Sequence, residues 1–548
     1  MAVVILRLLQ SPALVLGTGA LLLLACAAWA DPVPPPAGTL APVSLPVPSV
    51  QASVSPLGTA PMRIDPPPAD AVQRVRWLNQ RIDAILAASS LGRARMGVAV
   101  MDIESGRLLY ARNEGELLNP ASNVKLVTTA AALALLGPEF RCKTALYIDR
   151  DHRTNERANL YLRGFGDPTL QAEDLWRLSA ELSVRGVRRI GGDIVVDDSY
   201  FDDQRIGPGF DQKAEDAPFR APQGAVSLNL NAVGVRVSPG NAEGDPARVT
   251  VEPASAYFVV INEARTTASG RTHITVEASD DKSAAAGQER TVIHVRGAIR
   301  RGDASQDFWK RVGHPELYAG YTLRELLLRR GIKVGGRVVR GVVPQGAVLL
   351  GTHSSPPLGV IVRDINKRSN NFMAEQVLKI LGAETGGRPG TWRKGLEAVA
   401  RFLEGLGIPP DRYQMTNGSG LYDANRFSAG QIVTILRAAY RDFRYAADFA
   451  GSLGISGAEG TISHRMSGGL AERYVRAKTG TLLGVSCLSG YAGSPLPTAP
   501  RGPLAFSILM NDLPEDGGPA ARQAQDAIAE ALVAYLGAPS DQRVGTVR

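Results

Sequence analysis

The sequence predicts an α+β fold: an antiparallel sheet flanked by helices, built from both ends of the chain, with large β-rich domains inserted between those ends. Helical and strand-like patterns occur together before residue 140 and again after residue 350. Between these stretches, short β-rich runs broken by Gly and Pro dominate. With 548 residues the chain is too long for one compact core, so an insertion that splits one domain accounts for the order of the elements.

The first 30 residues have the pattern of an export signal. One basic residue, Arg7, precedes a long apolar stretch that ends in Ala28-Trp29-Ala30, a cleavage site of small residues. Two alternatives stay open: lipidation of Cys26, and an uncleaved membrane anchor. We therefore expect an exported, periplasmic protein, tethered to the membrane in the last two cases.

The organisation after the signal follows from composition. Residues 31–68 hold twelve of the 36 prolines and little charge, which is typical of an extended linker. We expect the first part of the main domain at 69–140, the inserted domains at 141–350, the second part at 351–537 and a flexible tail at 538–548.

The helices and strands are predicted from the spacing of apolar residues and from the residues that begin or end an element. Apolar residues at helical spacing predict a helix from near Ala69, and the runs 96–103 and 107–113 read as a hairpin. Asn119 as N-cap, Pro120 at the first position and Gly137-Pro138 as the stop predict a helix over 119–138. Later runs fall at 192–198, 233–239, 257–262 and 272–278 (strands), 358–381 and 391–407 (helices), 474–480, 484–493 and 504–512 (strands) and 520–536 (helix).

Composition excludes several classes of function. The net charge of +8 is spread without Lys/Arg blocks, so nucleic acid is not an expected partner. The six histidines form no ligand-spaced pair, and no phosphate loop or Gly-x-Ser-x-Gly elbow occurs, so we expect neither a metal nor a cofactor. Whether Cys142 and Cys487 form a disulfide stays open.

A serine and a lysine three residues apart lie at the start of the helix over 119–138. Ser122 and Lys125 share a face of the first turn, and the apolar remainder indicates that the helix is buried. A second Ser-x-x-Lys, at residues 279–282, lies in a polar run that reads as a solvated loop. The first copy alone is weak support for catalysis, because two fixed positions recur by chance.

Two later motifs supply partners for Ser122 and Lys125. Ser369 and Asn371 lie at the start of a helical run, where a capping role is the alternative reading. Ser-x-Asn also occurs at residues 227–229, inside an apparent strand. Lys478-Thr479-Gly480 is the only Lys-Thr/Ser-Gly in the chain; it ends a strand and is followed by Thr481.

Together, these motifs resemble those of penicillin-recognising serine acyl-enzymes. The 247 residues between Ser122 and Ser369, and the 109 between Ser369 and Lys478, resemble the class C penicillin-binding proteins, the D-alanyl-D-alanine carboxypeptidase/endopeptidase family. The segments 164–170, 221–240, 417–429, 459–466 and 477–493 also look like family segments. Asn417 and Tyr422 depart from the family's usual Asp and Ser. The resemblance implies a serine transpeptidase-like domain.

The chemistry of the groups gives a mechanism. Ser122 needs a base, and Lys125 can serve if burial and the neighbouring cation of Lys478 keep its amine neutral. By resemblance, Ser369 passes a proton to the leaving amine, and Asn371 holds the substrate amide and Lys125. Lys478, Thr479 and Gly480 would bind the terminal carboxylate side of the substrate, and the Thr481 N–H would help to bind the oxyanion. Asp167 would face the stem peptide by analogy, or else form a turn before Pro168.

We therefore expect a serine DD-peptidase, a D-Ala-D-Ala carboxypeptidase or DD-endopeptidase, that acts on peptidoglycan stem peptides and is inhibited by β-lactams. One alternative is a β-lactamase, although the chain lacks that class's small single domain and acidic Glu motif. Another is a non-catalytic peptidoglycan-binding scaffold with the same fold. Loss of a motif serine or lysine would favour the scaffold, and none is lost.

Overall fold

A computed structural model describes residues 66–537, with gaps at 90, 153–155, 214, 282–283, 286 and 497–500. The expected export signal, Cys26, nearly all of the proline-rich linker and the expected tail at 538–548 lie outside the described residues. No helix within the described ranges has both the length and the apolar character needed to cross a bilayer.

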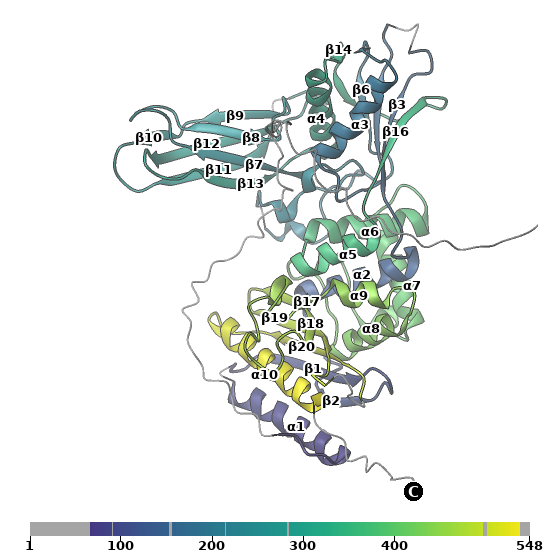
Figure 1. Ribbon diagram of the computed structural model, residues 1–548, viewed down its shortest axis with the longest axis vertical. Coiled ribbons are helices and arrows are strands. Elements are labelled where there is room, and N and C mark those ends of the chain that lie inside the picture. The colour runs from purple at the N-terminus through teal and green to yellow at the C-terminus, as the bar shows by residue number, and fades with distance from the viewer. Residues whose placement is uncertain are drawn as a thin grey trace, which may run out of the picture. The chain divides into compact units, whose positions relative to one another are not determined.

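The main sheet has six antiparallel strands in the order β17-β18-β19-β20-β1-β2 (Figure 1). Their bounds are β17 Gly454–Ile455, β18 Val475–Leu482, β19 Val485–Ala492, β20 Leu504–Asn511, β1 Arg95–Asp102 and β2 Leu108–Arg112. β1 pairs with β20 along its whole length, from Arg95 opposite Asn511 to Asp102 opposite Leu504. The prediction of one antiparallel sheet built from both ends of the chain is confirmed.

Helices cover both faces of this sheet. Side chains alternate along β20, as the two-residue period of a strand requires. Leu504, Phe506, Ile508 and Met510 pack in a core with α1 (Ala71–Ala88) and α10 (Gly517–Gly537). Ala505 and Leu509 pack in a second core with α2 (Val124–Leu136) and α8 (Ala429–Arg441). The central strands β19 and β20 are consequently buried on both sides.

The remaining helices of the second core are α5 Leu358–Arg368, α6 Asn371–Gly386, α7 Trp392–Gly405 and α9 Ala446–Ser452. The helical run predicted over 358–381 divides at Ser369, which has a left-handed backbone (φ 55°) and ends α5. Asn370 then caps α6, its side chain accepting the Met373 N–H at 3.0 Å. The capping role considered for this motif thus belongs to Asn370.

The helix predicted over 119–138 begins later than expected. A 3-10 turn, η1 (Ala121–Asn123), precedes α2, and Ala121 has a positive φ of 46° that no α-helix allows. Asn119 is therefore not the N-cap of the α-helix; its Oδ1 accepts the Ala121 N–H at 2.8 Å and shapes the turn instead. Gly137, with φ 81°, ends the helix as predicted.

The middle segment (residues 141–350) contains its own mixed sheet, in the order β15-β6-β4-β3-β16. β3 (Lys143–Ile148) lies antiparallel to β16 (Val348–Ser354), so the chain leaves and re-enters this part at neighbouring positions. Helices α3 (Ala172–Val184) and α4 (Pro315–Arg329), which the sequence reading missed, pack on each other and on this sheet (Figure 1).

Further short strands complete the middle segment. They form three separate sheets: one in the order β13-β7-β8, one made of β9 to β12, and the two-stranded pair β14-β5. The bounds of the middle strands are β4 Leu160–Gly164, β5 Arg189–Ile190, β6 Ile194–Asp197, β7 Ala232–Ser238, β8 Arg248–Glu252, β9 Phe258–Asn262, β10 Arg265–Thr267, β11 His273–Asp280, β12 Thr291–Arg300, β13 Gln306–Arg311, β14 Lys333–Val334 and β15 Val338–Arg340. The β-rich character predicted for this part is confirmed.

Three local predictions are settled by these elements. Ser279 lies in β11, so the loop predicted there is wrong; the strand pairs with β12 up to Asp280 opposite Thr291. The strand predicted at residues 227–229 is also wrong, because Asn229–Asn231 form a 3-10 turn with positive φ angles. Cys142 and Cys487 are both buried and both free, which answers the open question of a disulfide.

Candidate active site

The Lys125 amine is the centre of the candidate site. Its Nζ lies 2.9 Å from Ser122 Oγ, 2.7 Å from Asn371 Oδ1 and 2.6 Å from the Ser419 carbonyl oxygen. The two carbonyl oxygens can only accept, so each takes an N–H of the amine. When the amine is neutral and has just two N–H groups, its lone pair is left for the Ser122 hydroxyl proton. A hydroxyl and an amine at this distance can act as a nucleophile and its general base, the roles that the sequence predicts for Ser122 and Lys125.

Electrostatics favour the neutral form of Lys125. The side chain is fully buried. Burial lowers the pKa of Lys125 well below its ordinary value, and the positive charge of Lys478 lowers it further, while Glu375 acts in the opposite direction. The Ser122 side chain, by contrast, is only half-buried and remains reachable.

Lys478 forms a second serine–lysine pair. It lies in β18, and its Nζ donates to Ser369 Oγ at 2.8 Å and to the Thr479 carbonyl at 2.8 Å. Full burial lowers the pKa of Lys478 to about 7. Ser369 reaches this lysine from the left-handed position between α5 and α6, a costly conformation that typically persists where function requires it.

The rest of the Lys-Thr-Gly motif shapes the approach to Ser122. A Cβ on Gly480 would lie 2.5 Å from the Pro120 carbonyl oxygen, so only glycine lets β18 pack this closely against the turn before Ser122. Thr479 Oγ1 donates to Thr461 Oγ1 at 2.8 Å, which adds a hydroxyl that the sequence reading did not single out. Thr481, the next residue but one, is exposed.

Asp167 does not share in these hydrogen bonds. Its buried carboxylate accepts from the Thr169 N–H at 2.8 Å and the Thr169 hydroxyl at 2.6 Å, and lies 3.5 Å from His353 Nε2. Bonds from an Asp to the residue two positions on define an Asx turn. Asp167 therefore forms a turn, the second of the two roles considered for it.

A loop that sequence reasoning did not assign completes the surroundings of Lys125. Ser419 supplies the carbonyl acceptor, and the Thr128 hydroxyl ties the loop to α2 by donating to the Gly418 carbonyl at 2.8 Å. Gly420 has φ +75°, and a Cβ there would lie 1.9 Å from the Ala121 carbonyl oxygen. The glycines of the segment 417–421 indicated a tightly packed loop. The sequence could not show that the Ser419 carbonyl would contact Lys125, because every residue type has a backbone carbonyl.

The departure at Asn417 is accommodated within the same loop. Its Oδ1 accepts the Gly420 N–H at 2.9 Å, a bond that an Asp carboxylate could equally accept. Its Nδ2 donates to the Pro208 carbonyl at 3.1 Å and to the Leu421 carbonyl at 3.3 Å. Asn417 therefore holds the loop in shape through donors that an Asp would lack.

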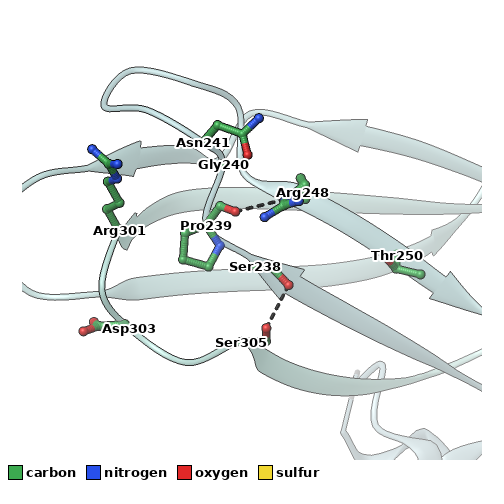
Figure 2. Close-up of a pocket in the computed structure, with 9 residues that line it drawn as sticks. All are labelled: Ser238, Pro239, Gly240, Asn241, Arg248, Thr250, Arg301, Asp303 and Ser305. Atoms are coloured by element: carbon green, nitrogen blue, oxygen red, sulfur yellow. Dashed lines mark hydrogen bonds between the residues drawn. The ribbon is translucent and has the colours of Figure 1, made fainter.

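A polar groove in the middle segment is separate from these residues (Figure 2). Its side chains mostly bond to their own surroundings: Ser238 Oγ to Ser305 Oγ at 2.8 Å, and Arg248 Nε to the Pro239 carbonyl at 3.1 Å. None of the predicted site residues lines it. In the part of the chain that the structure describes, no group of three or more His, Cys, Asp or Glu side chains is placed to hold a metal ion.

Comparison with known proteins shows extensive similarity. The model of the D-Ala-D-Ala carboxypeptidase 3 (S13) family matches residues 78–534. A D-alanyl-D-alanine carboxypeptidase of Actinomadura sp. strain R39 is 37% identical over 505 residues, 89% of this chain and 90% of that protein. The D-alanyl-D-alanine carboxypeptidase DacB of Haemophilus influenzae is 27% identical over 411 residues, 73% of this chain and 82% of that protein.

Among solved structures, penicillin binding protein 4 of Haemophilus influenzae has the same fold. The two structures align with a TM-score of 0.69 at 24% identity, covering 82% of this chain and 97% of the other. The same protein has been solved in complex with a β-lactam, and that structure aligns with a TM-score of 0.65. The predicted fold class, a transpeptidase-like domain with β-rich additions, is therefore confirmed.

Proposed function

The chain belongs to the D-Ala-D-Ala carboxypeptidase 3 (S13) family, and from this premise we propose that Ser122 carries its serine DD-peptidase activity. Substrates of this activity are peptidoglycan stem peptides that end in D-Ala-D-Ala. The observation that carries the assignment is the set of three contacts around Lys125 Nζ: two obligate acceptors and one hydroxyl. A lysine held in this way accepts a proton from the hydroxyl and from nowhere else among its three partners.

In the acylation step, Ser122 Oγ attacks the carbonyl carbon between the two D-alanines while its proton moves to Lys125 Nζ. The resulting tetrahedral oxyanion is stabilised by backbone N–H groups, for which the Ser122 N–H in η1 and the Thr481 N–H on β18 are our candidates. The bond to the terminal D-alanine then breaks, and Ser122 is left as an ester.

The leaving D-alanine amine needs a proton. Ser369 is hydrogen-bonded to Lys478 and, by analogy with the family, lies between the two lysines. Its hydroxyl can pass a proton to the amine and regain one from the protonated Lys125, so that Lys478 keeps its charge. Asn371, already bonded to Lys125, would hold the substrate amide. Lys478, with Thr479 and Gly480 beside it, would bind the terminal carboxylate as an ion pair. Water then hydrolyses the ester and frees Ser122.

β-Lactams are the expected inhibitors, since the lactam amide takes the place of the D-Ala-D-Ala amide and leaves a slowly hydrolysed ester on Ser122. We also propose the exported location and the division at 69–140, 141–350 and 351–537 that the sequence predicts; a membrane tether would depend on the first 30 residues. Asp167, as a side-chain contact of the stem peptide, stays a weaker proposal because its carboxylate is already engaged.

The test is an assay of the purified protein on defined muropeptides, together with fluorescent penicillin. Release of D-alanine from monomeric pentapeptide would establish carboxypeptidase activity, and cleavage of cross-linked dimers would establish endopeptidase activity. The penicillin label should map to Ser122 and persist. Label lost within seconds would favour the β-lactamase alternative, and a folded protein that neither cleaves nor labels would favour the non-catalytic scaffold.

A further inference from the structure

A buried carboxylate lies behind the proposed catalytic lysine. Glu375 is one helical turn after Asn371 on α6 and is fully buried. Its Oε1 accepts the Ser419 N–H at 2.7 Å. Its Oε2 accepts the Gly418 N–H at 3.2 Å and the indole N–H of Trp392 at 2.8 Å. Burial raises the pKa of Glu375, and the three donors that converge on its two oxygens act in the opposite direction, because they favour the ionised carboxylate.

Ser419 connects this carboxylate to Lys125 through a single residue. Its N–H donates to Glu375, and its carbonyl accepts from Lys125 Nζ at 2.6 Å. The loop bearing Ser419 is short and contains the left-handed Gly420, which packs on the backbone of Ala121 beside the nucleophile. Any shift of the loop therefore moves one of the two carbonyl acceptors that orient the lysine.

We propose that Glu375 is a positioning residue: by binding two backbone N–H groups of the loop 417–421, it holds the Ser419 carbonyl where it directs the Lys125 lone pair at Ser122. This inference rests on the proposed function. It names a role for Glu375 that neither the three motifs nor the substrate contacts include.

The negative charge of Glu375 gives the test a second readout besides the rate, namely the pKa of Lys125. Glu375 raises the pKa of Lys125, opposing the effects of burial and of Lys478. A Glu375→Gln substitution removes the negative charge and leaves one acceptor oxygen for three N–H donors. Both changes make the surroundings of Lys125 less negative. The protonated form of Lys125 is then less stable, so its pKa falls.

The matched control is Lys379, one turn further along α6. Lys379 is equally buried, and it bonds to Asp202 and to the Gln204 carbonyl of the middle segment instead of the loop 417–421. Lys379 also contacts the ring of Trp392, whose indole N–H donates to Glu375. A Lys379→Met substitution keeps an apolar side chain against that ring, removes a buried charge from the same helix, and deletes no hydrogen bond of Glu375 or Ser419. If loss of any buried charge on α6 disturbed the site, the two substitutions would act alike.

The experiment measures the rate constant of acylation by fluorescent penicillin across pH for the whole chain, with the label mapped. We expect Glu375→Gln to slow acylation by about 10- to 100-fold and to move the acidic midpoint of the profile to lower pH, since displacing a catalytic contact by about an ångström has effects of this size. Glu375→Asp keeps the charge, so it should keep a midpoint near that of the wild type while losing rate through its shorter reach. Lys379→Met should keep the wild-type midpoint.

The outcomes separate this inference from the proposed function. If wild-type protein is not labelled at Ser122, the proposed function fails. If it is labelled and the profile of Glu375→Gln coincides with that of the wild type or of Lys379→Met, only the positioning role fails. Should Glu375→Gln not fold, Glu375→Asp decides, because an unchanged acylation rate in that variant would contradict the role.

Discussion

Lys125 and Lys379 are two fully buried helical lysines with different neighbours. Burial lowers the pKa of both. Lys379 Nζ lies 2.6 Å from the carboxylate of Asp202 and 4.3 Å from the centre of the Trp392 ring, partners that favour its cation. Lys125 bonds instead to a hydroxyl and two carbonyl oxygens, and a second lysine, Lys478, lies close enough to repel its charge.

Since both lysines are buried, the difference between them lies in their partners. A carboxylate at hydrogen-bond distance pulls the pKa of a buried lysine back up, whereas a neighbouring cation pushes it down. We therefore propose that Lys379 is a charged structural residue that joins α6 to the middle segment, and that Lys125 is a neutral base.

Removing the hydroxyl beside Lys125 should have the largest effect. Ser122→Ala should reduce peptide hydrolysis by about a thousandfold or more and abolish penicillin labelling, because the acylated atom is gone. Circular dichroism and thermal unfolding would check that the fold is kept. Ser279→Ala, in the strand copy of the motif, is the control and should change neither activity. Labelling of the Ser122→Ala protein would refute the nucleophile.

Exchanging each of the two lysines for methionine should separate activity from stability. Lys125→Met should slow acylation by about 10²- to 10⁴-fold, the usual contribution of a general base. Lys379→Met should leave acylation nearly unchanged and lower the free energy of unfolding by about 1–3 kcal/mol, since Asp202 loses its partner. Urea titration and stopped-flow labelling would measure the two effects. A large loss of acylation rate in Lys379→Met would contradict the claim that Lys379 is purely structural.

Loss of Lys478 should mainly weaken binding of substrates that end in a carboxylate. Lys478→Ala should raise KM for a peptide ending in D-alanine by about tenfold or more, because a charge-assisted bond is lost. A substrate analogue with a terminal amide is the control, and its KM should respond little. Equal losses for acid and amide would mean that Lys478 does not bind the carboxylate.

The protonation of Lys478 gives a smaller, pH-dependent effect. Its pKa of about 7 means that the cation is present below neutral pH and is lost as pH rises. The KM for the carboxylate substrate should therefore rise above pH 7, by at most about tenfold per pH unit. The amide analogue should show no such rise. A KM that is flat between pH 7 and 9 would show that the lysine stays charged.

The main sheet and the central residue pairs could be predicted because their signals are local and strong. The strands 484–493 and 504–512 are apolar runs bounded by Gly or Pro, and the structure has β19 and β20 at these places. The strand predicted at 474–480 is β18, which continues to Leu482 instead of ending at the Lys-Thr-Gly motif. Helical spacing sufficed to pair Ser122 with Lys125, whereas Ser369 was placed near Lys478 through the resemblance to the family. In the middle segment, α3 carried a helical pattern at Leu175, Leu178 and Leu182 that the surrounding β-rich runs concealed.

Other parts of the site depend on features that no motif displays. Ser419 acts through its backbone carbonyl, and any residue type has one. Glu375 reads as an ordinary helical residue until the loop 417–421 is folded against it. The start of α2 was placed too early because the left-handed Ala121 breaks a pattern that otherwise fits a helix. Tertiary contacts decide each of these, so the sequence alone could not.

The most direct test of the contrast between the two lysines is the pH dependence of acylation in wild-type protein and in Lys478→Met. Methionine keeps the apolar volume of the lysine while the charge disappears. The pKa of Lys125 should then rise, and the acidic midpoint of the acylation profile should move to higher pH. A midpoint that stays in place, or moves to lower pH, would contradict the claim that a neighbouring cation keeps Lys125 neutral.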